Sequence, residues 1–136
     1  MGADAIRTVP ERWTTPRPLD ASPALGPGLN PASLEAGLRR LAGRDDVQAL
    51  VVFGSRASGR AQHHSDLDLL VIARQADLPP ERELPLWQEL RTALGDVGVP
   101  VDLLVYGRQD AAKLAGSRWH VLGHAARSGR MLYVAE

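Results

Sequence analysis

Apolar residues with helical spacing alternate with short, nearly continuous apolar runs along most of this chain. Leu34, Leu38 and Leu41 repeat at i, i+4 and i+7, which forms one apolar stripe along a helix. An Asn-Pro pair precedes the stripe, and proline is favoured at the first helical position. The pattern therefore predicts a helix that starts at Pro31 and ends at Gly43.

The apolar runs have the length and the Val and Leu content of β-strands. We predict strands at Val47–Phe53, Leu67–Ala73, Val101–Tyr106 and, as a short final strand, Met131–Val134. The first run is almost entirely apolar, which is typical of a strand that is buried on both faces.

Helical patterns fill the spaces between these runs. A short helical turn is expected at Ser55–Arg60, and a longer helix is expected to start at Pro85 and carry Leu86, Leu90 and Leu94. Two more are predicted at Asp110–Ala115 and Ser117–Ser128. The chain is therefore predicted to be an α/β (α+β) protein in which a small mixed β-sheet is flanked by helices.

The first 29 residues follow a different pattern, because five prolines interrupt any helical or strand period. We interpret residues 1–29 as a Pro-rich extended arm and residues 30–136 as a single domain. Trp13 and Leu19 are the arm residues that could hold it against the domain or a second subunit, and a mobile tail is the alternative.

Three aspartates lie where strands can bring them together. Asp66 and Asp68 are two residues apart, so both carboxylates leave the same face of their strand while Leu67 and Leu69 point into the core. Asp102 is the one acidic residue of an otherwise apolar strand. If the two strands pair, the three carboxylates can bind Mg²⁺, and Asp102 can accept the proton of an attacking hydroxyl.

The turn before the acidic strand has the composition of an anion site. Gly54 and Ser55 follow a buried strand and open a helical turn, whose first amides point outward. Ser55 can donate to a phosphate oxygen, and Arg56 and Arg60 can add positive charge. A phosphate site beside a metal site suits phosphoryl or nucleotidyl transfer.

These residues resemble a known family. Gly54-Ser55, ten residues, and then Asp66-Leu67-Asp68 is similar to the signature of the nucleotidyltransferase superfamily that includes DNA polymerase beta and kanamycin nucleotidyltransferase. The chain most resembles the minimal, single-domain members, many of which are encoded beside a helical HEPN protein and act as its antitoxin. The likeness runs from Leu34 to about Val134.

The resemblance implies a polymerase-beta-like fold and an Mg²⁺-dependent nucleotidyltransferase. Asp66 and Asp68 would hold two Mg²⁺ ions and Asp102 would complete the site, while Gly54 and Ser55 would hold ATP. The expected reaction is AMP transfer to a hydroxyl, such as a Tyr of a HEPN toxin. Ser58 stands where the family usually has Arg, which removes one cation from the turn.

The composition of the chain excludes several other classes of protein. The formal net charge is +0, so non-specific binding to nucleic acid is not expected. The chain has 0 Cys, no long apolar run and no signal-peptide pattern, so we expect a cytoplasmic protein without a membrane segment. Its core is too short to include an acceptor-binding domain, so a partner or a homodimer must present the acceptor.

Two alternatives to AMP transfer onto a toxin stay open. One is an antitoxin that acts by direct binding, with weak catalysis, and the other is an antibiotic nucleotidyltransferase.

Overall fold

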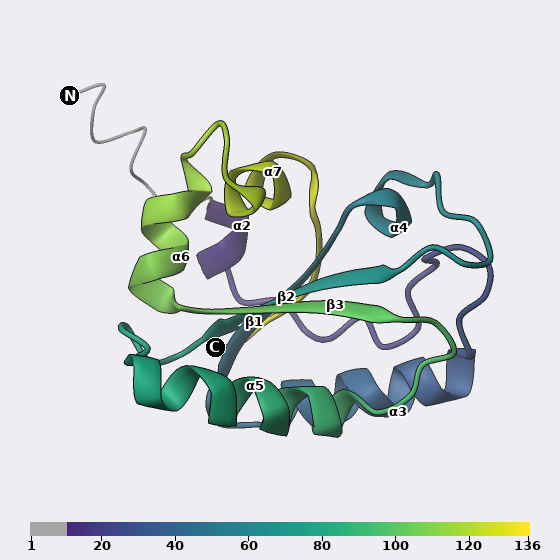
Figure 1. Ribbon diagram of the computed structural model, residues 1–136, viewed down its shortest axis with the longest axis horizontal. Helices are drawn as coiled ribbons and strands as arrows, with labels where there is room; N and C mark the ends of the chain where they lie inside the picture. Colours follow the sequence, from purple (N-terminus) through teal and green to yellow (C-terminus); the bar gives the residue numbers. More distant parts are fainter. Residues whose placement is uncertain (1–10) are drawn as a thin grey trace.

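A four-stranded mixed sheet lies at the centre of the computed structural model, which describes residues 11–136 (Figure 1). Its strands are β1 (Val47–Phe53), β2 (Leu67–Ala73), β3 (Val101–Gly107) and β4 (Arg130–Val134). The strand order is β3-β2-β1-β4, in which β2 and β3 are parallel and the other two pairs are antiparallel. The predicted strands and the predicted mixed sheet are confirmed.

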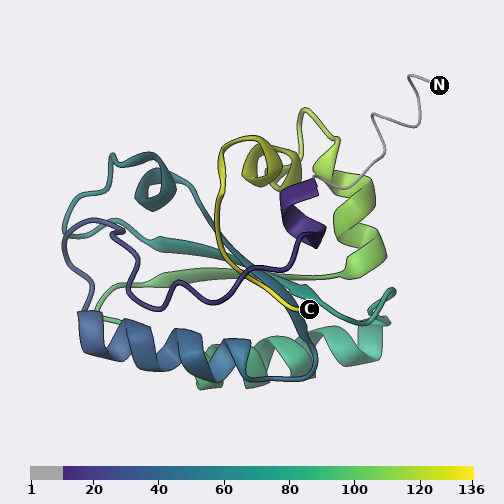
Figure 2. The same cartoon turned by 180° about the vertical axis from the view of Figure 1, so that it is seen from behind.

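Two long helices cover one face of the sheet, α3 (Pro31–Ala42) and α5 (Pro80–Leu94) (Figures 1 and 2). The Asn30 Oδ1 atom accepts a hydrogen bond from the Ser33 amide at 3.0 Å, which caps α3 as the Asn-Pro pair predicts. Leu38 and Leu41 of this helix are fully buried in the core between the helices and the sheet.

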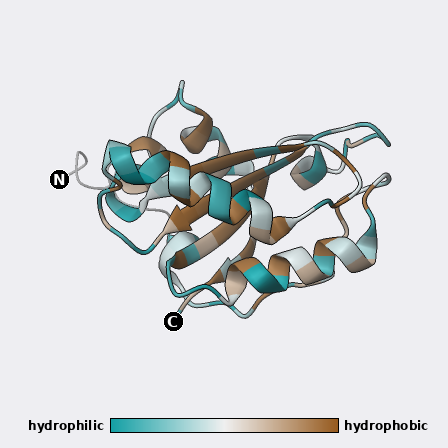
Figure 3. Cartoon of the chain, turned by 60° about the horizontal axis from the view of Figure 1, so that its bottom comes forward, coloured by the Kyte–Doolittle hydropathy of each residue, from teal (hydrophilic) through white to brown (hydrophobic). Residues whose placement is uncertain are grey.

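Three shorter helices cover part of the other face: α2 (Glu11–Thr14), α6 (Arg108–Ala115) and α7 (Val121–Ser128) (Figure 1). A second core lies beneath them and includes Trp13, Leu70 and Leu122. The strands between the two helical layers are the most hydrophobic part of the molecule (Figure 3). The single turn α4 (Ser55–Ser58) follows the end of β1 and leaves the neighbouring part of this face without a long covering helix.

Three helix starts differ from the prediction. Helix α5 begins at Pro80 and contains Pro85, which we expected at its start. Pro80 fits the first turn because its missing amide proton is not needed there, and Pro85 is exposed on the side away from the core.

Helix α7 begins at Val121 instead of Ser117. The Ser117 Oγ atom accepts from the His120 amide at 3.1 Å, and His120 Nδ1 accepts from the Leu122 amide at 3.1 Å. The His120 side chain thus occupies the Leu122 amide, which a helix that started at Ser117 would have bonded to the Arg118 carbonyl, and residues 117–120 form a turn. Helix α6 begins at Arg108, two residues before the predicted start.

The described part of the arm, residues 11–29, lies against the domain (Figure 2). It contains one helical turn, and the Trp13 side chain is only 2% exposed. Arg17 pairs with Val134 through two backbone hydrogen bonds of 3.0 and 3.1 Å, so the arm covers the outer edge of β4. None of the helices in residues 11–136 has the length and apolar character needed to cross a membrane.

Candidate functional site

The sheet brings two of the three candidate aspartates side by side. In the parallel pairing of β2 with β3, Asp68 lies directly opposite Asp102, and Phe53 at the end of β1 lies opposite Asp68 on its other side. Asp66 immediately precedes β2 and shares the face of Asp68 because side chains alternate along a strand. The intervening Leu67 is fully buried in the core on the opposite face, as the alternation predicts.

The glycine turn lies against the Asp68 carboxylate. Gly54 has φ +70°, and a Cβ atom built on it would lie 2.1 Å from Asp68 Oδ2. Any other residue at position 54 would therefore be strained and would displace the carboxylate. The close approach puts Asp68 next to the start of α4, where Ser55 is half-buried.

The negative charge at this end of the sheet is concentrated on three aspartates that form no ion pair within residues 11–136. Asp68 is half-buried, and its pKa is raised by burial first and then by the charges of Asp102 and Asp66. None of the four ion pairs found within residues 11–136 involves these three carboxylates. A bound cation would offset the repulsion among the three carboxylates, so this arrangement favours cation binding.

The donor atoms at this site fit a hard divalent cation such as Mg²⁺. Carboxylate oxygens are suitable ligands, and Mg²⁺ in proteins commonly takes only one or two of them, with water and substrate phosphate completing its coordination. Within residues 11–136, no three His, Cys, Asp or Glu side chains stand close enough together to hold a metal ion. The residues therefore fit a metal site in which two carboxylates and a substrate phosphate bind the ion. Asp68 and Asp102 are the best placed for this because they are opposite each other in the register of β2 and β3, and Asp66 lies beside them.

Arg56 lies away from the position at which a phosphate would bind. Its side chain is 2% exposed, and its guanidinium donates to four backbone carbonyls. These are Leu25 O at 2.9 Å, Pro27 O at 2.9 Å, Gln62 O at 3.3 Å and Ser65 O at 3.1 and 2.7 Å. All five N–H donors are thus used within the protein.

The Arg56 contacts connect three segments that are distant in sequence. They join α4 to the arm at residues 25–27 and to the loop at residues 62–65, which ends directly before Asp66. Burial lowers the pKa of Arg56, and the negative charge of Asp66 opposes that shift. The sequence pattern gave no sign of this role, because the acceptors are backbone atoms that any residue type supplies.

Arg60 is the cation that remains exposed at the turn. Its Nε atom donates to Ser58 Oγ at 3.2 Å, and its amide donates to Ser55 O at 3.0 Å. Ser58, which stands where Arg is usual in the signature, thus contacts the guanidinium two residues later. Of the two candidate phosphate-binding arginines, Arg60 is the one whose charge is free to face solvent.

Comparison with known proteins agrees with the fold and the motif. The family model described as Polymerase beta, Nucleotidyltransferase matches residues 38–133, and the chain belongs to that family. This range contains β1 to β3, the glycine turn and all three aspartates. The predicted polymerase-beta-like nucleotidyltransferase fold is confirmed.

Two solved structures are similar at low identity. A crystal structure of a toxin-antitoxin with AMP-PNP is 23% identical, covering 77% of this chain and 73% of that one, with a TM-score of 0.47. A crystal structure of a mutant of the toxin-antitoxin MntA-HpeT is 21% identical, covering 79% and 75%, with a TM-score of 0.46. Comparison with curated proteins gave no match.

Proposed function

We propose that this chain is an Mg²⁺-dependent nucleotidyltransferase that moves AMP from ATP to a hydroxyl group of a partner protein. The observation that carries the proposal is the contact between the Gly54 turn and the Asp68 carboxylate, opposite Asp102 in the parallel pair. A phosphate-binding turn and a metal-binding carboxylate pair are needed at the same place for nucleotidyl transfer, and membership of the nucleotidyltransferase family supports this reading.

In this proposal, each side chain has a defined task. Asp68, together with one neighbouring carboxylate, Asp102 or Asp66, and with substrate phosphate, would hold Mg²⁺. The ion would supply neutralisation of charge on the phosphate oxygens. The Ser55 hydroxyl and the first amides of α4 would bind the triphosphate, and Arg60 would add positive charge beside them. Arg56 would keep the loop before Asp66 in place through its contacts with backbone carbonyls.

The transfer itself conserves all atoms and charges. The acceptor oxygen attacks the α-phosphorus of ATP and forms the new P–O bond. The bond between that phosphorus and the bridging oxygen breaks, and pyrophosphate leaves with the electron pair. The hydroxyl proton passes to a carboxylate, for which Asp102 is suited because its side chain is exposed at the edge of the sheet.

We further propose that the acceptor is a Tyr hydroxyl of a HEPN-type toxin, so that the chain acts as an antitoxin. The described domain consists of one sheet and its covering helices, and in this proposal a second protein presents the acceptor. A toxin that loses activity when a Tyr of its site carries AMP fits this requirement.

A second candidate is an antitoxin that inactivates its partner by binding alone. The contacts of Arg56 favour this candidate, because they leave Arg60 as the one arginine of the turn that can reach a phosphate. Such a site would still bind ATP, although more weakly, and would lose most of the transfer rate.

The test is ATP-dependent labelling of a co-expressed HEPN-type partner, followed by mass spectrometry. Asp66→Ala should abolish the added AMP while leaving the circular dichroism spectrum unchanged. Asp45→Ala is the matched control, since Asp45 is exposed and distant from the site. Unchanged labelling by Asp66→Ala would refute the catalytic proposal, whereas inhibition of the partner without ATP would support the second candidate.

A further inference from the structure

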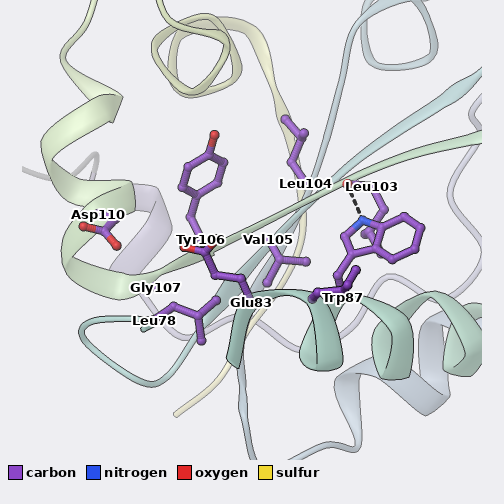
Figure 4. Close-up of a pocket in the computed structure, with 10 residues that line it drawn as sticks. Leu78, Glu83, Trp87, Leu103, Leu104, Val105, Tyr106, Gly107 and Asp110 are labelled. Carbon is purple, nitrogen blue, oxygen red and sulfur yellow. Dashed lines mark hydrogen bonds between the residues drawn. The ribbon is translucent and has the colours of Figure 1, made fainter. Parts of the chain in front are cut away.

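The outer edge of β3 is the edge of the sheet that the described chain leaves open. The opposite edge, β4, is covered by the arm, where Arg17 pairs with Val134 and the Asp20 amide donates to Leu132 O at 2.8 Å. β3 instead borders a groove of about 380 Å³ between α5 and the start of α6 (Figure 4). We call it the β3 groove and define it by Leu84, Trp87, Leu104 and Tyr106, together with the charged lining residues Glu83 and Asp110.

Exposed apolar side chains gather at this groove. Within residues 11–136, the large hydrophobic side chains that are exposed are Leu84 at 61%, Trp87 at 37%, Trp119 at 91% and Val121 at 37%. The first two line the groove. The other two flank His120, whose ring contacts Tyr106 edge-to-face at 5.9 Å between centroids. Apolar surface therefore lies on both sides of the edge of β3, which is a common mark of a protein interaction site.

One backbone carbonyl at the open edge of β3 is already bonded to a side chain. The Trp87 Nε1 atom donates to Leu103 O at 2.9 Å, so a backbone carbonyl that a new strand would need is occupied (Figure 4). The groove is better suited to a helix, whose backbone hydrogen bonds are satisfied internally and whose apolar face would contact Leu84 and Trp87.

The charge of the groove indicates which charged residues the bound helix should carry. Both charged side chains that line it, Glu83 and Asp110, are acidic. A second copy of this chain would bring another acidic pair against them. A helix with an apolar face flanked by Lys or Arg would complement them, because opposite charges across an interface favour association.

The groove begins one residue from the candidate active site, because its lining includes Leu103. Asp102 directly precedes Leu103 on β3, and Asp102, Leu104 and Tyr106 share one face of the strand. Residues two apart on a strand are separated by about 7 Å, so a helix seated beside Leu104 would lie close to the carboxylates. A side chain that extends from such a helix could reach the reacting phosphate.

We infer that the β3 groove binds an amphipathic, basic-flanked helix of the acceptor protein and so presents the acceptor hydroxyl to Asp102. This inference rests on the proposed function, because it assumes that the acceptor belongs to a protein. It adds the surface that recognises that protein and the chemistry of the segment recognised.

Binding of the co-expressed HEPN-type partner, measured by size-exclusion chromatography and calorimetry without ATP, tests the surface. Leu84→Arg should weaken the affinity at least tenfold, because it puts a cation where the partner is apolar and basic. Gln88→Arg is the control: Gln88 is also exposed on α5, but it borders a different surface, beside Arg44 and Thr92. Glu83→Lys should weaken binding as well and reduce its dependence on salt.

The results separate this inference from the proposed function. If Asp66→Ala binds the partner normally and fails to label it, while Leu84→Arg fails to bind, the groove is the docking site. Parental affinity in both Leu84→Arg and Glu83→Lys would overturn the inference and leave the transfer reaction intact. A homodimer that Leu84→Arg dissociates would also overturn it, because the occupant would then be a second copy.

Discussion

The two arginines of the α4 turn have the same chemistry and different positions. Arg56 is buried and donates to four carbonyls, whereas Arg60 is exposed and contacts Ser58. A guanidinium has five donors in a planar fork, and it can serve several carbonyls at once where a Lys ammonium, with three donors, cannot. Burial in a loop junction therefore explains why Arg stands at position 56.

Replacing Arg56 should destabilise the fold, and replacing Arg60 should not. Arg56→Met would leave buried carbonyls without donors, at an expected cost of about 2–4 kcal/mol in the free energy of unfolding. Arg56→Lys should recover part of that loss. Arg60→Ala should change stability by less than about 0.5 kcal/mol and raise the KM for ATP. Urea denaturation and steady-state kinetics measure the two effects, and equal stability losses would contradict the assignment.

The raised pKa of Asp68 predicts a conflict between stability and function. A carboxyl whose pKa is higher in the folded than in the unfolded chain opposes folding when it is ionised. This penalty is absent below the ordinary pKa of 3.8, grows as the pH rises from there to the folded pKa, and is complete above the folded pKa. Asp68→Asn should therefore raise Tm at pH 7 in EDTA, and the difference should disappear near about pH 3.

The same variant tests the metal. Mg²⁺ that binds only the folded state raises Tm by mass action, so it should stabilise the parent protein and leave Asp68→Asn nearly unchanged. Differential scanning calorimetry with and without MgCl₂ measures both effects. A variant that is less stable than the parent at pH 7 without metal would show that Asp68 is held by favourable contacts instead.

At the scale of elements, the helix that covers the sheet below β3 tolerates a proline in its interior. Pro85 lies in the second turn of α5 and removes the amide that would bond to the Glu81 carbonyl. The apolar stripe of Leu86, Leu90 and Leu94 is buried and holds the helix on the sheet. Tertiary packing thus outweighs the local cost of the proline.

Pro85→Ala should stabilise the protein because it restores that hydrogen bond and removes no buried contact, since Pro85 is exposed. We expect a gain of roughly 1–2 kcal/mol, which is less than the full cost of an interior proline because alanine also frees the unfolded chain. Thermal and urea unfolding measure the change. A loss of stability would mean that Pro85 makes contacts that its exposure does not reveal.

At the scale of the whole molecule, the arm belongs to the structure of the domain. It contributes the buried Trp13 to the second core, the backbone partner of β4 at Arg17, and two of the carbonyls that bind Arg56. Substitutions in the arm should therefore destabilise both the second core and the loop before Asp66.

Trp13→Ala should cost about 3–5 kcal/mol because it empties a buried aromatic site. Trp119→Ala is the control: Trp119 is 91% exposed, and its loss should change stability by less than about 0.5 kcal/mol. Equilibrium denaturation compares the two. Similar small effects from both would show that the domain is stable without the arm.

The periodicity of apolar residues was sufficient to predict the four strands, α3 and the mixed sheet. The spacing of apolar residues shows directly which face of a helix or strand is buried. Periodicity was insufficient to predict where α5 and α7 begin. Pro80 can start α5 because it has no amide proton to satisfy, and the Ser117 and His120 side chains accept hydrogen bonds from the amides before and at the start of α7. The spacing of Gly54, Asp66 and Asp68 likewise predicted that a turn and an acidic strand would meet.

The sequence by itself therefore determined the family, the sheet and the residues that carry the candidate chemistry, since these depend on local spacing and on alternation along a strand. Only the tertiary structure decided three features. Asp68 lies opposite Asp102, and carbonyls hold Arg56 so that it does not face a phosphate. The arm covers one edge of the sheet, and residues 11–136 leave the edge of β3 open. Each of these depends on contacts between backbone atoms far apart in the chain, and residue types along the sequence do not encode where such atoms meet.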